Sequence, residues 1–446
     1  MELRMSGRMK LLSSDIHIYP FCILQIFSNL LVDLDKDSKS PDCWNSPDMR
    51  LSWLNLLCVG LLKPTSASDD VDVLSELAAE AFENAHRTVS RSSSGHTGRR
   101  TCTLASLSIR QEWGSLSKSQ RKDYIRAVQC LQIKPTRTPS TLAPGAKSRF
   151  DDFVVTHLNQ TQTVHFTGNF LSWHRYYIWL YEKALREECG YKGYQPYWDW
   201  SVTAETGLLS SPIFDGSDTS MGGNGVYLGI RSDIVLGAGL DLPPIYLPTG
   251  SGGGCIESGP FKNMTVNLGP VALDSPGGVS EGPPSGNPLD WNPRCLRRDL
   301  TDAVNRRWAN ASSIVSLISN SKNVHDFQMT MQGVPGSGEI GVHGGGHYSI
   351  GGDPANDVFV SPGDPIFYLH HAMIDRVWWI WQHIENPFQR QFSDGAISGT
   401  RTFWDMPPSA NATLDDMIDF RYAAGPACPI RDLLSTVDGP FCYVYL

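Results

Sequence analysis

Seven of the twelve histidines in this chain lie in two clusters, and this spacing is the feature best suited to chemistry. The first cluster contains His157, His165 and His174, and the second contains His343, His347, His370 and His371. A single histidine on an apolar helix is usually a core residue, but grouped histidines are common ligands of transition metals. The two clusters therefore predict metal sites.

The segment from His343 to His347 reads HGGGH and raises a structural question. Two histidines four residues apart would share one face of a helix, yet three consecutive glycines make a poor helix interior. We therefore expect irregular backbone here, which glycine allows at little steric cost while both imidazoles approach one ion.

The residue types in the clusters point to a particular metal. Neutral imidazole suits copper and zinc, whereas thiolates favour Cu(I) or iron–sulfur clusters and carboxylates favour magnesium, calcium or manganese. The sequence has no HExxH motif, and the clusters lack the mixture of carboxylates and histidines that di-iron bundles use. Two all-histidine sites indicate two copper ions, which together would bind O₂ and give it one electron each.

Helices must hold these histidines in place, and helical spacing occurs in four segments. The segments are Val71–His86, Leu116–Gln132, Ser172–Gly190 and Asp364–Glu385. His174 lies at the start of the third segment and His371 lies inside the fourth, so two rigid elements would each present one ligand. The stretch from residue 215 to residue 294 is rich in glycine and proline, which predicts an irregular connection that walls the mouth of an active site.

Two longer patterns resemble the copper signatures of the tyrosinase, catechol oxidase and molluscan haemocyanin superfamily. HFTGNFLSWHRYYIWLYE, from His165 to Glu182, is similar to the first signature, and DPIFYLHHAMID, from Asp364 to Asp375, is similar to the second. With PYWDW at residues 196–200, the resemblance covers roughly residues 100 to 446. It implies a mainly α fold in which a central four-helix bundle holds a dicopper site, with long irregular loops and little β structure.

The resemblance also implies the ligands of each copper ion. The first copper would take His157, His165 and His174, and the second would take His343, His347 and His371. His370 would line the site as a buried, hydrogen-bonded neighbour. Arg175 and Glu182 follow the family pattern as structural residues, and Asp375 would either orient an arginine or imidazole or form a simple helix salt bridge.

Two further positions narrow the subtype that the resemblance implies. Thr163 stands where plant and many long fungal members have a cysteine that forms a thioether with the second histidine, so that crosslink should be absent. Tyr443–Tyr445 resembles the Tyr-x-Tyr motif that closes the core domain in this family, with Arg110 as its expected partner. The chain thus resembles the short fungal polyphenol oxidases, which need no removal of a C-terminal domain.

Two residues near the second cluster bear on the reaction. Oxidising an o-diphenol needs an open dicopper site and a pocket for a flat ring, whereas hydroxylating a monophenol also needs a base. In tyrosinases that base is attributed to a water held by a glutamate and by an asparagine directly after the first histidine of the second copper, where this chain has Gly344. Glu339 is either the glutamate that helps to hold this water or an exposed loop residue. We expect o-diphenols to be oxidised to o-quinones, with weak or absent monophenol hydroxylation.

The sequence is also compatible with other functions, within and beyond copper oxidation. The first alternative is a tailoring oxidase for a phenol or o-aminophenol in a fungal secondary-metabolite pathway. Haemocyanin-like O₂ binding is disfavoured because haemocyanins repeat similar domains in tandem and no repeat is evident here. A copper-free descendant conflicts with the complete set of six histidines. The expected partners are O₂ and a small phenolic substrate.

Composition excludes some classes of partner. The chain has 446 residues, is 41% hydrophobic, and carries 37 Lys and Arg against 46 Asp and Glu, a net charge of −9. Without a basic stripe, nucleic acid is not an expected partner. The apolar runs before residue 63 are too short or impure for a membrane span, so no stable membrane association is expected.

The N-terminal region has the layout of a leader. Residues 1–48 are interpreted as a spurious or disordered extension, and residues 49–67 as a secretory signal that begins at Met49 and is cleaved near Ala67. The alternative is that all of this region is a disordered extension. Residues 68–446 would then form one secreted domain. They contain seven cysteines, so at least one should be free or pair outside this set, and the sequons are at Asn159, Asn263, Asn310 and Asn411.

Overall fold

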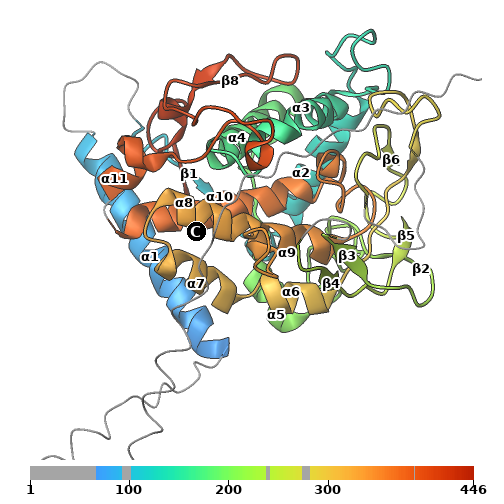
Figure 1. The fold of residues 1–446 in the computed structure, drawn as a ribbon, viewed down its shortest axis with the longest axis horizontal. Helices are drawn as coiled ribbons and strands as arrows, with labels where there is room; N and C mark the ends of the chain where they lie inside the picture. Colours follow the sequence, from blue (N-terminus) through green and yellow to red (C-terminus); the bar gives the residue numbers. More distant parts are fainter. Residues whose placement is uncertain (1–66, 93–101, 238–241, 274–281, 386) are drawn as a thin grey trace, which may run out of the picture. The chain divides into compact units, whose positions relative to one another are not determined.

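Helices provide most of the regular structure in the computed structural model, which describes residues 67–92, 102–237, 242–273, 282–385 and 387–446 (Figure 1). The helices are α1 (Ala67–Ser92), α2 (Lys118–Ile133), α3 (Arg149–Val164), α4 (Phe170–Cys189), α5 (Trp200–Thr206), α6 (Asp302–Trp308), α7 (Ala311–Asn320), α8 (Val324–Gln332), α9 (Gly341–Ile350), α10 (Phe367–Ile384) and α11 (Pro387–Phe392). The mainly α fold class is confirmed. The predicted extension and leader lie, apart from Ala67, outside the described residues.

The strands are short and form five two-stranded pairs within the described residues. They are β1 (Ser108–Arg110), β2 (Gly225–Tyr227), β3 (Ile234–Leu236), β4 (Ile245–Leu247), β5 (Gly253–Ile256), β6 (Thr265–Val266), β7 (Arg294–Cys295), β8 (Met417–Ile418), β9 (Cys428–Pro429) and β10 (Tyr443–Tyr445). β1 pairs with β10 in parallel, whereas β2–β5, β3–β4, β6–β7 and β8–β9 are antiparallel. The glycine-rich connection is therefore less irregular than expected, although its β structure is small.

Local sequence signals explain where the central helices begin and end. α2 and α3 each begin with a capping box, in which Ser117 or Ser148 accepts a hydrogen bond from the backbone three residues later and that residue's side chain accepts one in return. α4 ends at Gly190, whose φ of 68° is the left-handed conformation that glycine adopts without strain. The helices predicted around α1, α2, α4 and α10 are all present.

The HGGGH segment is helical, so the prediction of irregular backbone there is wrong. All five residues lie inside α9. Each glycine costs about 1 kcal/mol relative to alanine in a helix interior. Close packing explains why glycine is present despite this cost. A Cβ at Gly345 would lie 2.9 Å from Cβ of Trp308, and one at Gly346 would lie 2.2 Å from Cε1 of His370. These glycines therefore let neighbouring side chains approach the helix rather than let the chain bend.

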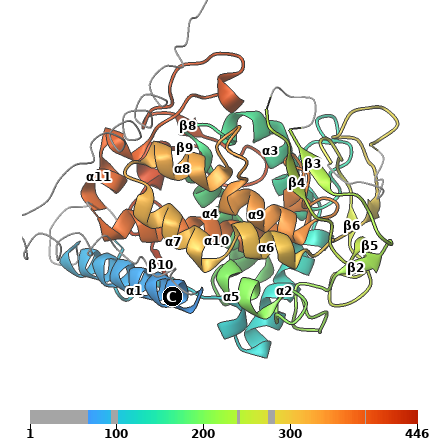
Figure 2. The ribbon, with the colours of Figure 1, turned by 60° about the horizontal axis from the view of Figure 1, so that its bottom comes forward.

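α4 and α10 pack against each other in the centre of the helical core. α3 also contacts α4, α9 contacts α10, and α1 runs along α10 and α7 on the outer side (Figures 1 and 2). Stacked aromatic rings join α4 to α10, with Tyr181 and Tyr368 at a centroid separation of 3.4 Å. This arrangement brings together the four helices that carry or adjoin the clustered histidines. None of the described helices has the length and apolar character needed to cross a membrane.

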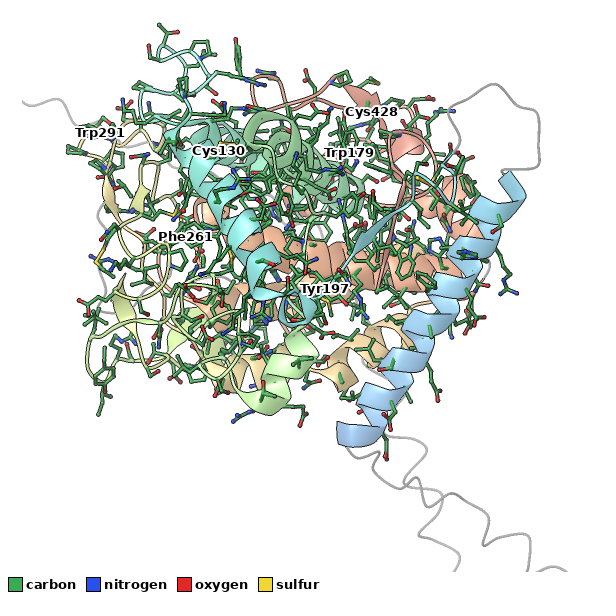
Figure 3. All side chains as sticks on the ribbon, turned by 180° about the vertical axis from the view of Figure 1, so that it is seen from behind. Cys130, Trp179, Tyr197, Phe261, Trp291 and Cys428 are labelled. Carbon is green, nitrogen blue, oxygen red and sulfur yellow. A yellow bond between two sulfur atoms is a disulfide. The ribbon has the colours of Figure 1, made fainter. Side chains whose placement is uncertain are left out.

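Three disulfides tie distant parts of the chain together. They join Cys102 to Cys442, Cys130 to Cys189, and Cys255 to Cys295. Cys428, labelled with Cys130 in Figure 3, is the only free cysteine among the described residues. The expectation of one unpaired cysteine is therefore confirmed for this part of the chain.

Candidate metal centre

The first histidine cluster is built by α3 and α4. His157 lies on α3, His165 directly follows that helix, and His174 lies one turn into α4. All three side chains are buried, and one nitrogen from each lies within 4.8 Å of those of the other two. The structure thus brings together the three residues that the sequence analysis assigned to one site.

Backbone carbonyls fix which ring nitrogen of each histidine faces the cluster. Nδ1 of His157 lies 2.9 Å from the Phe359 carbonyl, Nδ1 of His165 lies 3.0 Å from that of Thr161, and Nδ1 of His174 lies 2.8 Å from that of Phe170. In a neutral ring, Nδ1 must donate to such an acceptor, which leaves the Nε2 lone pair available for a metal. Nε2 of His157 and of His174 are buried and have no hydrogen-bond partner.

The second cluster is built by α9 and α10. Nδ1 of His347 lies 3.2 Å from the Ala355 carbonyl, and its Nε2 lies 3.3 Å from Nε2 of His371. Nε2 of His343 is buried without a partner. The His371 ring stacks on His174 with centroids 4.5 Å apart, so it stands between the two clusters. The ring of Phe367 also stacks on His371, with a centroid separation of 4.0 Å.

His370 belongs to the same group but has different surroundings. Its ring is pressed against Gly346, and its centroid lies 5.2 Å from that of Trp200. Neither ring nitrogen has a hydrogen bond of good geometry to a described residue, so the expected hydrogen bond of His370 stays a prediction. Burial lowers the pKa of His370 well below its usual value. The neighbouring His347 lowers this pKa further, and the backbone of His343 offsets part of the effect. Its place beside the ligand cluster agrees with the prediction.

Burial keeps the clustered imidazoles neutral. It lowers the pKa of His165 to about 4 and that of His347 to about 3. For His157, His174, His343 and His371, burial and the neighbouring imidazoles hold the pKa well below its usual value. Neutral imidazole is the form that binds a metal ion. Buried and unpartnered Nε2 atoms in two nitrogen-only groups fit copper, because each such atom otherwise bears an uncompensated desolvation cost.

A cavity of about 340 Å³ opens onto the histidines. His165, His343 and His347 form part of its wall, and both Glu339 and Gly344 line it. The rest of the wall is mainly apolar and comes from the β3–β4 hairpin, the segment before α9, and aromatic side chains. Such a cavity, with few polar groups converging at one end, is the usual form of a small-molecule site.

Aromatic residues in this wall were missed by the sequence analysis. Phe166 follows His165 with a φ of 51° and packs against Phe403 at 5.1 Å and Trp404 at 5.5 Å between ring centroids. All three line the cavity. Only the position of Phe166 next to a histidine could have suggested it, because the other two lie far along the chain outside any motif.

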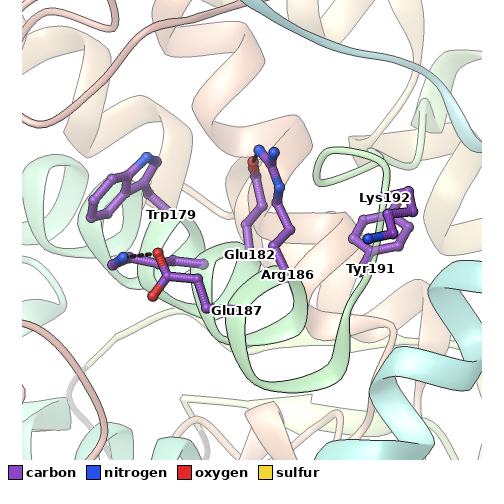
Figure 4. Close-up of a pocket in the computed structure, with 7 residues that line it drawn as sticks. Trp179, Glu182, Arg186, Glu187, Tyr191 and Lys192 are labelled. Atoms are coloured by element: carbon purple, nitrogen blue, oxygen red, sulfur yellow. Dashed lines mark hydrogen bonds and ion pairs between the residues drawn. The ribbon is translucent and has the colours of Figure 1, made fainter.

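A second cavity, of about 450 Å³, lies on α4 and contains no histidine (Figure 4). Its described lining residues are Trp179, Glu182, Lys183, Arg186, Glu187, Tyr191 and Lys192. Cations and carboxylates alternate there, and Lys183 pairs with Glu187. Both of its carboxylates are already paired with cations, Glu182 with Arg110 and Glu187 with Lys183, so this surface hollow offers no group of free ligands like the histidines.

Asp375, on α10, is the centre of a buried hydrogen-bond network next to the histidine clusters. Its carboxylate accepts hydrogen bonds from Arg175 (2.6 Å) and from the hydroxyls of Tyr443 (2.6 Å) and Tyr445 (2.6 Å). Arg110 lies 3.3 Å from the same carboxylate and 2.8 Å from Glu182. Asp375 therefore binds arginines rather than an imidazole. Arg110 also donates a hydrogen bond to the hydroxyl of Tyr445 at 2.9 Å, which confirms the predicted link to the Tyr-x-Tyr segment.

The model for the common central domain of tyrosinase matches residues 147–384, which include every clustered histidine. The chain belongs to the tyrosinase family, whose members are oxidoreductases with a binuclear copper site of type 3. The fold and the two histidine groups described above agree with that assignment.

Fungal proteins resemble this chain over most of their length. Tyrosinase P of Aspergillus terreus is 40% identical over 338 residues, covering 76% of this chain and 91% of that protein. The N-acetyl-6-hydroxytryptophan oxidase of Emericella nidulans is 38% identical over 361 residues, covering 77% and 93%. A solved structure of a mutant polyphenol oxidase from Thermothelomyces thermophila has a TM-score of 0.75 and 45% identity, covering 84% of this chain and 97% of that one.

Proposed function

We propose that this protein oxidises o-diphenols to o-quinones with O₂ and has weak or absent activity toward monophenols. His157, His165 and His174 would hold one copper ion, and His343, His347 and His371 would hold the other. The observation that carries the proposal is the convergence of buried, neutral imidazoles at the end of an apolar cavity. When bound, the copper pair supplies a path for electrons from the phenol to O₂.

The reaction balances without another reductant. Two catechols each lose two electrons and two protons, and one O₂ accepts all four of each and becomes two molecules of water. In this chain the apolar walls of the cavity would hold the flat ring, and the carbonyls behind the histidines keep their Nε2 atoms directed inward. The pocket needs no further charged group for this step.

Glu339 and Gly344 are poorly suited to support efficient monophenol hydroxylation. Glu339 is the only carboxylate among the described residues that line the cavity. It accepts a hydrogen bond from the indole of Trp308 at 2.6 Å, and its side chain is 59% exposed. An exposed carboxylate that is already hydrogen-bonded is poorly placed to position a water as base, and Gly344 offers no polar group.

His371 rather than His370 is proposed as the third ligand of the second copper. His371 faces His174 across the two clusters, and its Nε2 points to that of His347. His370 instead packs between α9 and Trp200. We therefore expect His371→Ala to lower the copper content of the purified protein from two ions per chain toward one, and His370→Phe to retain both.

A tailoring oxidase for another phenol or an o-aminophenol is the second candidate. The observation in its favour is the 38% identity to a protein named for oxidising N-acetyl-6-hydroxytryptophan, a phenol larger than catechol. Oxygen uptake by copper-loaded protein on catechols, monophenols and o-aminophenols separates the candidates. Fastest turnover of simple catechols supports the first, fastest turnover of an o-aminophenol supports the second, and rapid turnover of tyrosine without a lag contradicts the first.

We also propose that the protein enters a secretory route. Three disulfides are the pattern expected of an oxidising compartment. Three of the four sequon asparagines, Asn159, Asn263 and Asn411, are exposed, whereas Asn310 caps α7 with its side chain. N-terminal sequencing of secreted protein tests the proposed leader: a start near residue 68 supports a signal that begins at Met49 and is cleaved near Ala67, and a start before Met49 contradicts it.

A further inference from the structure

The cavity in front of the histidines has an unusual balance of charge. Its described lining residues include no lysine or arginine, and their only carboxylate is Glu339. Apart from the proposed copper pair, a substrate that enters this cavity therefore meets mainly apolar surface and one carboxylate, that of Glu339.

Glu339 is held at the rim of the cavity. Glu339 lies two residues before α9. Its Oε2 accepts the hydrogen bond from Trp308, which holds the carboxylate against the end of α6. Arg307 is the nearest cation, at 4.0 Å, but the two side chains are 56% and 59% exposed. An ion pair at that distance and exposure is weak, so it leaves most of the negative charge of Glu339 available to a ligand.

We propose that Glu339 sets the charge specificity of this site, so that its substrates are phenols that are neutral or carry an amine, and phenols that carry a carboxylate are rejected. The inference rests on the proposed function and names its substrate class. A carboxylate on the substrate would lose hydration in the cavity without gaining a cation, and Glu339 would repel it. An ammonium group on a short chain would instead reach the rim and pair with Glu339.

The test compares three catechols that share a ring and differ in the charge of a short side chain. They are 4-ethylcatechol, dopamine and 3,4-dihydroxyphenylacetate. In the copper-loaded full chain at neutral pH, we expect kcat/KM for dopamine to exceed that for the acid by about tenfold or more, a size that single pocket contacts reach. Glu339→Gln should lower this ratio by about threefold or more, mainly through KM, because glutamine keeps the hydrogen bond from Trp308 but loses the charge.

Glu187→Gln is the matched control. Glu187 is 60% exposed and paired with Lys183, as Glu339 is 59% exposed beside Arg307, but it lies in the hollow on α4 (Figure 4). This variant should keep the wild-type ratio of dopamine to acid. An unchanged ratio in Glu339→Gln, or a wild-type preference for the acid, would overturn the proposal.

A binding measurement separates this inference from the proposed function. Quenching of tryptophan fluorescence in the metal-free protein reports binding of phenethylamine and phenylacetate, because Trp404 lines the cavity. The amine should bind more tightly, and the difference should shrink in Glu339→Gln. If none of the catechols is oxidised, the proposed function fails, and this comparison alone decides whether Glu339 selects charge. Equal binding of the two ligands by the wild-type protein contradicts the inference.

Discussion

At the scale of single residues, the glycines of α9 determine how closely the second cluster packs. A Cβ at Gly346 would meet three atoms of the His370 ring, the nearest at 2.2 Å, whereas the atom nearest to one at Gly344 would be Cβ of Ile340, at 3.0 Å. The His370 ring is buried and hemmed in by Trp200 and His347. It therefore has little room to move, and Gly346 is required for steric reasons rather than for flexibility.

Gly346→Ala should destabilise the protein and disturb its metal site. Overpacking of this kind typically costs about 1–3 kcal/mol, and it would displace α9 together with His343 and His347. We expect a lower melting temperature and fewer than two bound copper ions per chain. Gly344→Ala, in the same helix, is the control and should keep both ions. Full copper content and an unchanged melting temperature in Gly346→Ala would contradict this packing argument.

Gly344→Asn tests the residue that the sequence analysis connected with the choice of reaction. Gly344 lines the cavity next to His343, so a carboxamide there would face the substrate. We expect the ratio of monophenol to o-diphenol turnover, measured by oxygen uptake, to rise about tenfold. This is less than the roughly hundredfold or more that a fully positioned acid–base group contributes, because Glu339 stays hydrogen-bonded to Trp308. A ratio that stays the same would show that Gly344 does not limit hydroxylation.

At the scale of elements, Asp375 links the helices of the centre to the terminal strands. It lies on α10 and binds Arg175 of α4 and both tyrosines of β10. Burial would raise the pKa of Asp375, but Arg175, Arg110 and the tyrosine hydroxyls outweigh it and hold the pKa below its usual value. The ionised carboxylate is therefore part of the folded state, and the pH dependence of stability has a defined sign.

Asp375→Asn should reduce stability strongly, because it leaves the buried Arg175 without its counter-charge, a loss of about 3–5 kcal/mol. The contribution of Asp375 is present above the unfolded pKa of about 3.9 and is lost as pH falls through the lower folded value. Thermal melts should show a large difference between variant and wild type at neutral pH that narrows below about pH 4. Asp415→Asn, which removes an exposed partner of Arg431, should change little. A difference that widens on acidification would contradict this account.

At the scale of the whole described chain, the beginning and end of the dicopper region are held together covalently. The disulfide between Cys102 and Cys442 closes a separation of 340 residues beside the β1–β10 pair. A disulfide constrains the unfolded chain more as its loop lengthens. It therefore supports the same junction that the Arg110 and Asp375 contacts hold.

Replacing both Cys102 and Cys442 with serine should lower the free energy of unfolding by about 2–5 kcal/mol. Because the histidines lie on other elements, copper binding at low temperature should persist. Cys428→Ser is the control, since that cysteine is free. A melting temperature equal to that of the wild type would show that the non-covalent contacts alone hold the junction.

The sequence predicted the parts of this site that rest on local patterns. The helices around His174 and His371 follow from apolar spacing and end signals, and the partner of the Tyr-x-Tyr segment followed from the family resemblance. The helical conformation of HGGGH was not predictable, because the contacts with Trp308 and His370 that favour it come from distant residues. Phe403 and Trp404 were missed for the same reason, since their place in the cavity depends on tertiary folding.

Oxygen uptake by the copper-loaded protein on 4-methylcatechol tests whether this protein oxidises o-diphenols. We predict immediate consumption of O₂, at one molecule for every two quinones formed, and its loss when copper is removed with a chelator. Tyrosine should be consumed far more slowly under the same conditions. A protein that carries two copper ions per chain and consumes no O₂ with the catechol, or that turns over tyrosine faster, would contradict the proposed function.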